Sequence, residues 1–365
     1  MLSEIGSNFW INPVDIQGVR PLDTPCILFG YKGSDFVWMS SGRSATRMVL
    51  KTIEERNPNL PKTALLPPFT CHTVIEPFLE YGYEVHSLPL SMDLTTTADE
   101  IVQCQEETKA SVVLVHRYYG FDTLPGFNKA VDVLTSKGVV VIEDCTQCLY
   151  CDFKVSNADY FVGSIRKWCG APDGGFAVCK EGMFTGKPSN ADNVMVEAKR
   201  LASEMKYQFL FEGKGDKPTF KAKYREAEAL LDNQTSFYSI GKLSATIQAN
   251  LNVDFLRCRR RINYQVLLDG LKETNAYRIV FQHLPEGVIP LYFPLLVENR
   301  EQLQDVLAGN DIYAPVVWPK PDCCPAIGEM AETIYNQILC IPIDQRYRED
   351  DMKRIVNVIN KNYEK

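Results

Sequence analysis

The sequence lacks the two features that most directly place a protein in a membrane or on a nucleic acid. No apolar run among its 365 residues approaches the length that crosses a bilayer, which is about twenty residues. Its 39 basic residues are outnumbered by 46 acidic ones, so the formal net charge is −7. Since nucleic-acid binding requires a basic face, we expect a globular protein with neither a membrane span nor a nucleic-acid partner.

A secretion signal is also missing. The N-terminal stretch holds neither the basic segment nor the apolar core of a signal peptide. Twelve cysteines without such a signal predict reduced thiols and a cytoplasmic protein. The hydrophobic content of 45% and the charged content of 23% are ordinary for a globular chain, and the length is sufficient for two domains.

Short apolar runs alternate with helical patterns between residues 36 and 180. This alternation predicts an α/β domain with a mostly parallel, seven-stranded sheet that helices cover on both faces. Ligands of such sheets bind beyond the carboxyl ends of the strands. We expect strands at 36–40, 63–67, 83–88, 110–116, 139–144, 158–162 and 175–179, and helices at 45–56, 73–81 and 127–136.

The remaining segments predict further helices and a smaller domain. Residues 183–235 are charged and helical in pattern, with a break at 213–218. We expect one long helix at 239–271, a strand at 287–297, and helices at 300–308 and 349–362. The predicted organisation is an N-terminal arm at 1–35, a large α/β domain at 36–238 and a small α+β domain at 239–365.

One basic run, from Arg257 to Arg261, lies within the long predicted helix. We interpret it as a solvated helix face. The alternative is that it contacts an anionic substrate or a partner subunit.

A lysine and an aspartate stand at the ends of predicted strands. Lys167 lies on a loop between two apolar runs, within Ser164-Ile-Arg-Lys167, and Asp144 ends another apolar run. A pyridoxal phosphate (PLP) enzyme needs both groups, because its lysine forms a Schiff base and its carboxylate keeps the pyridine nitrogen protonated. The alternatives are a loop lysine that pairs with Asp173, and an aspartate that only caps a helix.

A small polar turn, Ser41-Gly42-Arg43-Ser44, joins a predicted strand to a predicted helix. Free backbone N–H groups at a helix start bind phosphate, and glycine lets the backbone approach closely. Ser164 would add a hydroxyl, and Arg43 would pair with the phosphate or with the substrate. The alternative is a turn that only caps the helix.

Further polar residues follow the strand ends. His116 either faces the cofactor or is structural, and Gln147 either contacts the cofactor ring or is a polar helix residue. Tyr118 and Tyr119 either line a substrate pocket or pack in the core.

The cysteines raise an alternative from another class. Cys145, Cys148 and Cys151 have the spacing of an iron–sulfur ligand set, which would indicate a redox or radical protein. Asp144 and Gln147 interleave with them in the order that a PLP site needs, and we expect Cys148 and Cys151 to begin a helix. We therefore predict no metal site, and free thiols at Cys323 and Cys324.

Several of these segments resemble motifs of one known family. Ser41–Ala45 is similar to its Ser-Gly-Thr-Ala-Ala turn, and Glu143–Gln147 to its Glu-Asp-Ala-Ala-Gln. Thr70–Gly82, His116–Gly120, the Lys167 loop with Asp173-Gly174-Gly175, and Ile338–Pro342 match further motifs in the same order. From residue 36 onward, the chain thus resembles the DegT, DnrJ, EryC1 and StrS sugar aminotransferases, which are fold-type-I PLP enzymes.

The resemblance implies a PLP-dependent transferase that moves an amino group from an amino acid, such as glutamate, to a nucleotide-linked keto sugar. The product would serve polysaccharide or secondary-metabolite synthesis. The resemblance also implies a homodimer with its active site at the subunit interface. The implied catalytic residues are Lys167 and Asp144, and the implied cofactor-binding residues are Ser41, Gly42, Arg43, Ser44, Cys71, His72, His116, Asp144, Gln147, Ser164 and Lys167.

The chain departs from the family pattern at three places. Cys71 stands where the family stacks an aromatic residue on the cofactor, so the ring is expected against Cys71 or His72. The spacing around Lys167 is shorter than usual, and the asparagine that the family lends across the dimer has no clear match. A PLP enzyme of another reaction type and a non-catalytic relative that binds PLP or a regulatory ligand remain alternatives. The family's dehydratases carry histidine in place of the lysine, so Lys167 argues against that branch.

Overall fold

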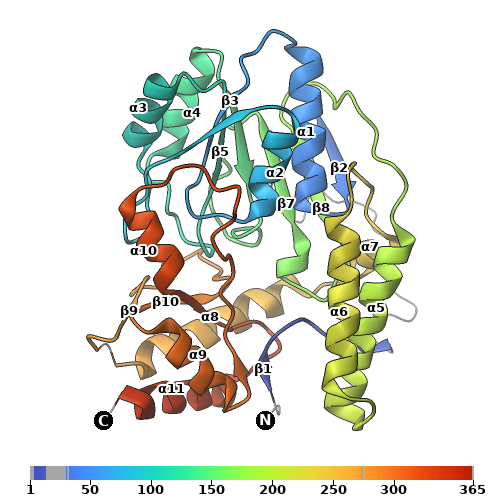
Figure 1. Cartoon of the computed structure of the whole chain (residues 1–365), viewed down its shortest axis with the longest axis vertical. Coiled ribbons are helices and arrows are strands. Elements are labelled where there is room, and N and C mark those ends of the chain that lie inside the picture. Colours follow the sequence, from blue (N-terminus) through green and yellow to red (C-terminus); the bar gives the residue numbers. More distant parts are fainter. Residues whose placement is uncertain (1–3, 14–29, 31–32, 273, 364–365) are drawn as a thin grey trace. The chain divides into compact units, whose positions relative to one another are not determined.

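The computed structural model describes residues 4–13, 30, 33–272 and 274–363 (Figure 1). Most of the predicted arm at 1–35, including Cys26, lies outside the described residues. The chain divides into two compact units: Met1–Ser7, Pro61–Ala158 and Asn252–Lys365 form the first, and Asn8–Leu60 and Asp159–Leu251 form the second. The domain boundaries expected near residues 35 and 238 stay a prediction.

Seven strands make up the large sheet, as the sequence predicts. The first unit holds four of them, which are parallel to one another in the order β6 (Val140–Asp144), β5 (Val112–His116), β3 (Thr63–Leu66) and β4 (Glu84–Ser87). The central strands β5 and β3 are mostly apolar and buried, as expected of strands covered on both faces, whereas the edge strand β4 has no buried residue. The crossover helices between them are α2 (His72–Glu80), α3 (Ala98–Thr108) and α4 (Phe127–Ser136).

The other three strands belong to the second unit, in the order β2 (Asp35–Met39), β8 (Gly175–Cys179) and β7 (Tyr160–Ser164). Strand β8 runs antiparallel to both of its neighbours. Helix α1 (Gly42–Arg56) follows β2, and the short turn η3 (Ile165–Lys167) follows β7. The unit is completed by α5 (Asn193–Tyr207), the π-helical η4 (Gln208–Glu212), α6 (Lys217–Asp232) and α7 (Lys242–Ala249).

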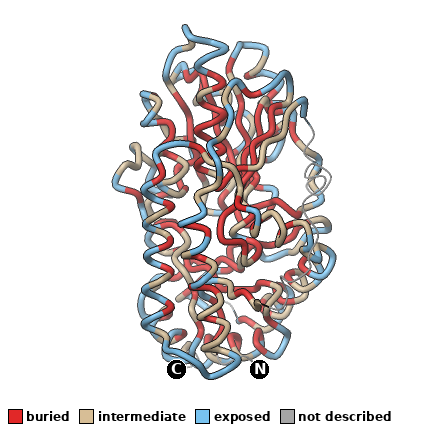
Figure 2. Tube along the Cα trace, turned by 90° about the vertical axis from the view of Figure 1, so that its right-hand side faces the viewer, coloured by how far each residue is buried: buried red, intermediate tan, exposed pale blue. Residues whose placement is uncertain are grey.

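The C-terminal part of the first unit has an antiparallel sheet in the order β12 (Ile338–Ile341), β10 (Phe293–Val297) and β9 (Tyr277–Ile279). A short parallel pair joins β1 (Ile5–Gly6) to β11 (Ile312–Tyr313). The helices here are α8 (Val253–Gly270), α9 (Arg300–Ala308), α10 (Glu329–Gln337) and α11 (Glu349–Tyr363). Figure 2 shows that the strands run mostly through buried residues, whereas the helices alternate buried and exposed positions.

Three expectations about local structure were wrong. The helix expected at 239–271 is two helices, because Asn252 caps α8 by accepting from Phe255 N–H at 3.0 Å. The strand expected at 287–297 begins only at Phe293, and Leu291 N–H before it donates to Tyr119 O at 2.9 Å. The helix expected from Cys148 is a series of turns, which opens with Thr146 N–H donating to Asp144 Oδ1 at 2.8 Å.

The basic run on α8 is not a solvated face. Arg260 is fully buried, and its guanidinium donates to the carbonyls of Pro290 and Leu291. The other three arginines also bind partners on nearby segments: Arg257 binds Tyr150 and Asp152, Arg259 binds Glu349, and Arg261 binds Pro285 and Val288. These contacts hold α8 in the first unit.

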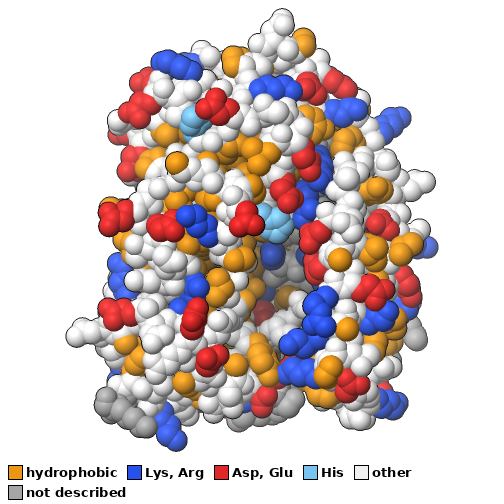
Figure 3. Space-filling model, in the orientation of Figure 1, with side chains coloured by type: hydrophobic (Ala, Val, Ile, Leu, Met, Phe, Trp, Pro, Cys, Tyr) orange, Lys and Arg blue, Asp and Glu red, His pale blue; other side chains and the backbone are white. Residues whose placement is uncertain are grey.

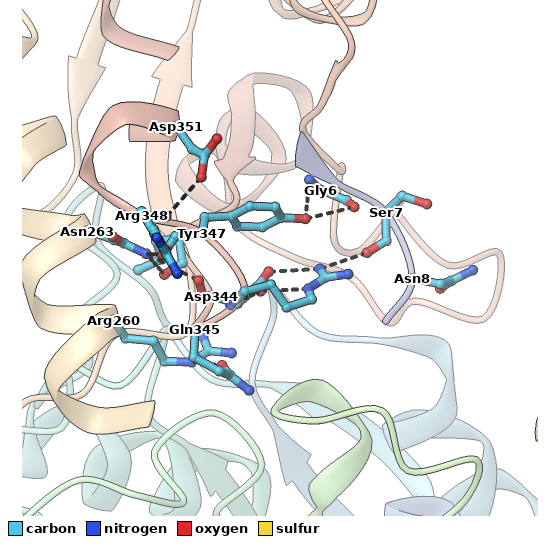
Figure 4. Close-up of polar contacts among 12 residues, drawn as sticks. Gly6, Ser7, Asn8, Arg260, Asn263, Asp344, Gln345, Tyr347, Arg348 and Asp351 are labelled. Atoms are coloured by element: carbon cyan, nitrogen blue, oxygen red, sulfur yellow. Dashed lines mark hydrogen bonds and ion pairs between the residues drawn. The ribbon is translucent and has the colours of Figure 1, made fainter. Parts of the chain in front are cut away.

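A buried polar network attaches the N-terminal strand β1 to the C-terminal part of the first unit (Figure 4). Gly6 N–H donates to the Tyr347 hydroxyl at 2.7 Å, and Arg346 donates both to Ser7 O at 3.1 Å and to Asp344 at 2.7 Å. Burial alone would raise the pKa of Asp344, but the charges of Arg346 and Arg260 hold it below its usual value.

Within the described residues, no helix combines the length and the apolar character needed to cross a bilayer. On the face shown in Figure 3, acidic and basic side chains are interspersed.

Candidate active site

The predicted site residues belong to both units, and the first unit holds Asp144 and His116. These residues end the neighbouring parallel strands β6 and β5, and the register pairs them directly. Asp144 is half-buried and accepts a hydrogen bond from Thr146 N–H. The structure therefore brings the predicted carboxylate and histidine together at the carboxyl edge of the parallel strands, where ligands of such sheets bind.

His116 is buried in a fixed hydrogen-bond network. Tyr119 N–H donates to Gln147 Oε1 at 2.8 Å, which leaves Gln147 Nε2 to donate to His116 Nδ1 at 3.3 Å. The histidine proton therefore lies on Nε2, which donates to Thr70 Oγ1 at 3.2 Å. Burial lowers the pKa of His116 to about 3, so the ring is neutral at ordinary pH.

Tyr118 and Tyr119 pack in the core, the second of their two predicted roles. The Tyr118 hydroxyl donates to Phe69 O at 3.0 Å, and Cys340 Sγ donates to the Tyr119 hydroxyl at 3.3 Å. Burial raises the pKa of each phenol far above the ordinary value for tyrosine, so neither tyrosine ionises. The Trp318 ring stacks on the Tyr119 ring, and the centres of the Trp318 and His116 rings are 5.5 Å apart.

Cys71 and His72 begin α2. Cys71 is the half-buried N-cap residue, and His72 is exposed. The Thr73 hydroxyl donates to Cys71 Sγ at 3.2 Å. Contact of either residue with a cofactor ring stays a prediction.

The sequence analysis did not predict an ion pair that lies at the ends of β5 and β6. Arg117 binds the fully buried Glu143 and also Asp122, at 3.1 Å. Because side chains alternate along a strand, Glu143 lies on the opposite sheet face from Asp144, and Ser156 donates to it there. The pair joins the ends of β5 and β6 and thereby fixes how His116 and Asp144 are presented. The sequence signal for this pair was the charged residue Glu143 inside the apolar run of β6.

In the second unit, Ser41 caps α1 by accepting from Ser44 N–H at 3.1 Å. The Ser40 and Ser44 hydroxyls are 2.9 Å apart. A Cβ placed on Gly42 would lie 3.7 Å from Ser164 Cβ, so Ser164 lies beside the helix start as expected. Arg43 forms an ion pair with Asp232 at 2.7 Å. Its predicted pairing with a phosphate or substrate is untested.

Lys167 ends the η3 turn that follows β7. Ile165 and Trp168 on either side are fully buried, and Trp168 N–H donates to Ile165 O at 3.0 Å. Lys167 itself is exposed. The backbone is therefore anchored on both sides while the side chain projects from it.

The alternative interpretation of Lys167 was a loop lysine that pairs with Asp173. In the structure, Asp173 binds other partners. It is fully buried, and its Oδ2 accepts from Gly241 N–H at 2.8 Å, at the start of α7. Burial raises the pKa of Asp173 to about 6, so this carboxyl holds its proton more strongly in the folded state.

This raised pKa predicts a pH dependence of stability. The contribution of Asp173 is fully present below its ordinary pKa of 3.8 and is lost as the pH rises through about 6. The loss is on the order of 3 kcal/mol. Melting curves between pH 4 and 7 should therefore show a smaller loss of stability in Asp173→Asn than in the unchanged protein. Parallel profiles would contradict the assignment.

The three cysteines with iron–sulfur spacing donate to backbone carbonyls. Cys148 Sγ donates to Cys145 O at 3.8 Å, and Cys151 Sγ donates to Gly120 O at 3.2 Å. Burial raises the pKa of Cys151 well above its ordinary value, which favours the thiol. Throughout the part of the chain that the structure describes, no three His, Cys, Asp or Glu residues form a group that could hold a metal. Cys323 and Cys324 are free thiols, as predicted.

Comparison with known proteins gives a match in structure only. No protein-family profile and no curated protein sequence matches this chain. The sugar aminotransferase CalS13 from Micromonospora echinospora is 17% identical, with a TM-score of 0.67 over 99% of both chains. A DegT DnrJ EryC1 StrS aminotransferase from Brucella abortus is 15% identical, with a TM-score of 0.64 over 98% of this chain and 92% of that one.

A third structure carries a different activity. The GDP-4-keto-6-deoxymannose-3-dehydratase ColD is 14% identical, with a TM-score of 0.64 over 91% of this chain and 89% of that one. The shared fold extends over nearly the whole chain in each case. The chain therefore has the fold of the sugar aminotransferases of the DegT, DnrJ, EryC1 and StrS type, as the sequence resemblance implied.

Proposed function

We propose that this protein is a PLP-dependent aminotransferase that moves an amino group from an amino acid, with glutamate as the donor, to a nucleotide-linked keto sugar. The observation that carries the proposal is Lys167, which projects from an anchored turn in a chain with the fold of sugar aminotransferases. The amino sugar produced would serve polysaccharide or secondary-metabolite synthesis.

The residues present are suited to hold PLP. Ser41 and Ser44 lie at the start of α1, where the N–H groups of a helix attract phosphate. Ser164 lies beside this helix start, 3.7 Å from the position that a Cβ on Gly42 would take. In the first unit, Asp144 supplies a carboxylate for the pyridine nitrogen, and the neutral His116 next to it adds no positive charge.

PLP, when bound, accepts the electron pair left behind when a proton leaves the α-carbon of an amino acid. Lys167 would bind the cofactor covalently and then take up and return that proton through Nζ. Asp144 would keep a proton on the pyridine nitrogen, since a carboxylate favours the protonated form of a neighbouring base. Gln147 would act through His116, whose ring it orients.

The first half of the reaction gives a direct test. Given glutamate but no keto sugar, the PLP-loaded protein should release one equivalent of 2-oxoglutarate per site and lose its visible absorbance. Addition of a nucleotide-linked keto sugar should then yield an amino sugar, detected by mass spectrometry. A loaded protein that releases no oxo acid with any amino donor would be a binding protein instead.

Two alternatives follow from specific observations. The likeness to ColD supports a dehydratase, but Lys167 stands where the family's dehydratases carry histidine. Cys71 in place of the stacking aromatic residue supports a non-catalytic relative. The glutamate half of the reaction separates a non-catalytic relative from an aminotransferase. The second half separates a dehydratase, because only an aminotransferase delivers the amine to the keto sugar.

The proposal includes two features of the protein in the cell. We infer a homodimer, because the resemblance implies an active site shared between subunits, and a closed two-fold dimer is the commonest assembly. We infer a reducing, cytoplasmic compartment, which the eleven free cysteines of the described residues support.

A further inference from the structure

Two reciprocal hydrogen bonds join the loop that carries Lys167 to helix α7, within the second unit. Asp173 Oδ2 accepts from Gly241 N–H at 2.8 Å, and Asp173 N–H donates to Ser244 Oγ at 3.1 Å. Asp173 and Ser244 are both fully buried. Gly241 is the N-cap residue of α7 and offers no side-chain cap. Asp173 therefore supplies the acceptor for the N-cap N–H that an ordinary capping box takes from its own helix.

The residue after Asp173 ties the same loop to two further backbone segments. Gly174 N–H donates at 2.6 Å to Ser40 O, directly before the turn at residues 41–44, which we name the serine turn. Gly174 O accepts at 3.2 Å from Ile165 N–H, at the start of the η3 turn, which we name the lysine turn. Glycine is needed here, because φ is +125° and a Cβ would lie 2.6 Å from the Ile165 side chain. Gly174 thus binds the backbone next to both turns.

Strand pairing places the two turns beside one another. Strand β8 lies between β2 and β7 and runs antiparallel to both, so the carboxyl ends of β2 and β7 lie at the edge where β8 begins. Gly175, the first residue of β8, pairs with Met39 on one side and with Ser164 on the other. A Cβ on Gly175 would lie 2.4 Å from the Ser41 carbonyl carbon, so no larger residue fits there. The serine turn follows β2 and the lysine turn follows β7, and the chain that enters β8 lies between them.

We propose that Asp173 and Ser244 are positioning residues, which lock the loop to α7 and thereby hold the lysine turn in a fixed position relative to the serine turn. The inference deepens the proposed function and rests on it for its chemical meaning. Lys167 reaches the aldehyde of a cofactor held by its phosphate at the serine turn only while the two turns keep their spacing. Such alignment raises the rate at which the two groups react.

A comparison of PLP with pyridoxal, which lacks the phosphate, measures this alignment. The amine of Lys167 condenses with either aldehyde, water leaves, and borohydride reduces the C=N bond to a stable amine that peptide mass mapping quantifies. The ratio of the two labelling rates at Lys167 reports how well the phosphate places the aldehyde. Asp173→Ala and Ser244→Ala should each lower this ratio by roughly ten- to a hundredfold. A loss of stability alone would slow both labelling reactions equally and leave the ratio unchanged.

Two further variants serve as matched controls at the same pH. Asp173→Asn keeps an oxygen that accepts from Gly241 N–H, so it should retain the ratio. Thr246→Ala removes a hydroxyl from the same helix, but that hydroxyl donates to Lys242 O at 2.8 Å, within α7. It should also retain the ratio. An unchanged ratio in Asp173→Ala or Ser244→Ala, or an equal fall in Thr246→Ala, would overturn the inference.

Hydrogen exchange of the whole protein, without added cofactor, tests the same lock independently of any ligand. In Asp173→Ala, the amides of peptides spanning 36–46 and 159–168 should both exchange roughly tenfold faster, because the hydrogen bonds that hold the loop between them are weakened. Faster exchange confined to α7 would contradict the inference. The proposed function fails separately: without a PLP adduct on Lys167 of the unchanged protein, that function is refuted, while the exchange rates still decide whether the lock exists.

Discussion

Replacing Lys167 with alanine should abolish the covalent attachment of PLP and lower the rate of amino transfer by roughly 10⁴-fold or more. The side chain would supply both the amine that binds the cofactor and the group that moves the proton. Its removal therefore affects two steps at once. The measurement is reduction of the PLP-loaded protein with borohydride, followed by peptide mass mapping and by an assay with glutamate.

The fold should survive this substitution. Lys167 is exposed, whereas its neighbours Ile165 and Trp168 are buried and anchor the turn. An exposed substitution of this kind changes stability by about 0.5 kcal/mol at most. Lys221→Ala, an exposed position on α6 of the same unit, is the matched control and should keep the adduct. An adduct on another lysine, such as Lys199, would contradict the assignment of Lys167.

Most strands of the large sheet were predictable because they are short, continuous apolar runs. Val112–His116 and Gly175–Cys179 are buried throughout, and no polar residue interrupts either run before its end. Helix α3 was missed although Thr97 and Glu100 form a capping box, which is a recognisable start signal. The break between α7 and α8 was missed because Asn252 serves as an N-cap inside an otherwise helical pattern.

The candidate site was predictable in its residue types but not in its partners. His116 could be placed at a strand end, but its bond to Thr70 joins residues 46 positions apart. Asp173 and Ser244 are separated by 71 positions. Such pairs depend on how distant elements pack, and a single sequence holds no local signal for them. The arginines of α8 illustrate the same limit, because their backbone partners come from loops elsewhere in the unit.

Asp144 has two proposed roles, and one substitution separates them. As a turn residue it accepts from Thr146 N–H through Oδ1; as a catalytic carboxylate it would keep the pyridine nitrogen protonated. Asparagine retains an oxygen for the hydrogen bond but carries no charge. Asp144→Asn should therefore fold normally and bind PLP, yet release 2-oxoglutarate from glutamate roughly 10²–10³-fold more slowly, as expected when a preorganised charge is removed.

Asp93 offers a control with the same local geometry. Its Oδ1 accepts from Thr95 N–H at 3.2 Å, two residues onward, as that of Asp144 does from Thr146. Asp93 is exposed on a loop of the same unit, so Asp93→Asn should keep full activity and similar stability. If Asp144→Asn behaves like Asp93→Asn in rapid-mixing measurements of the glutamate reaction, Asp144 only shapes the turn. A selective loss in Asp144→Asn at equal melting temperature means that the charge itself is used in the chemistry.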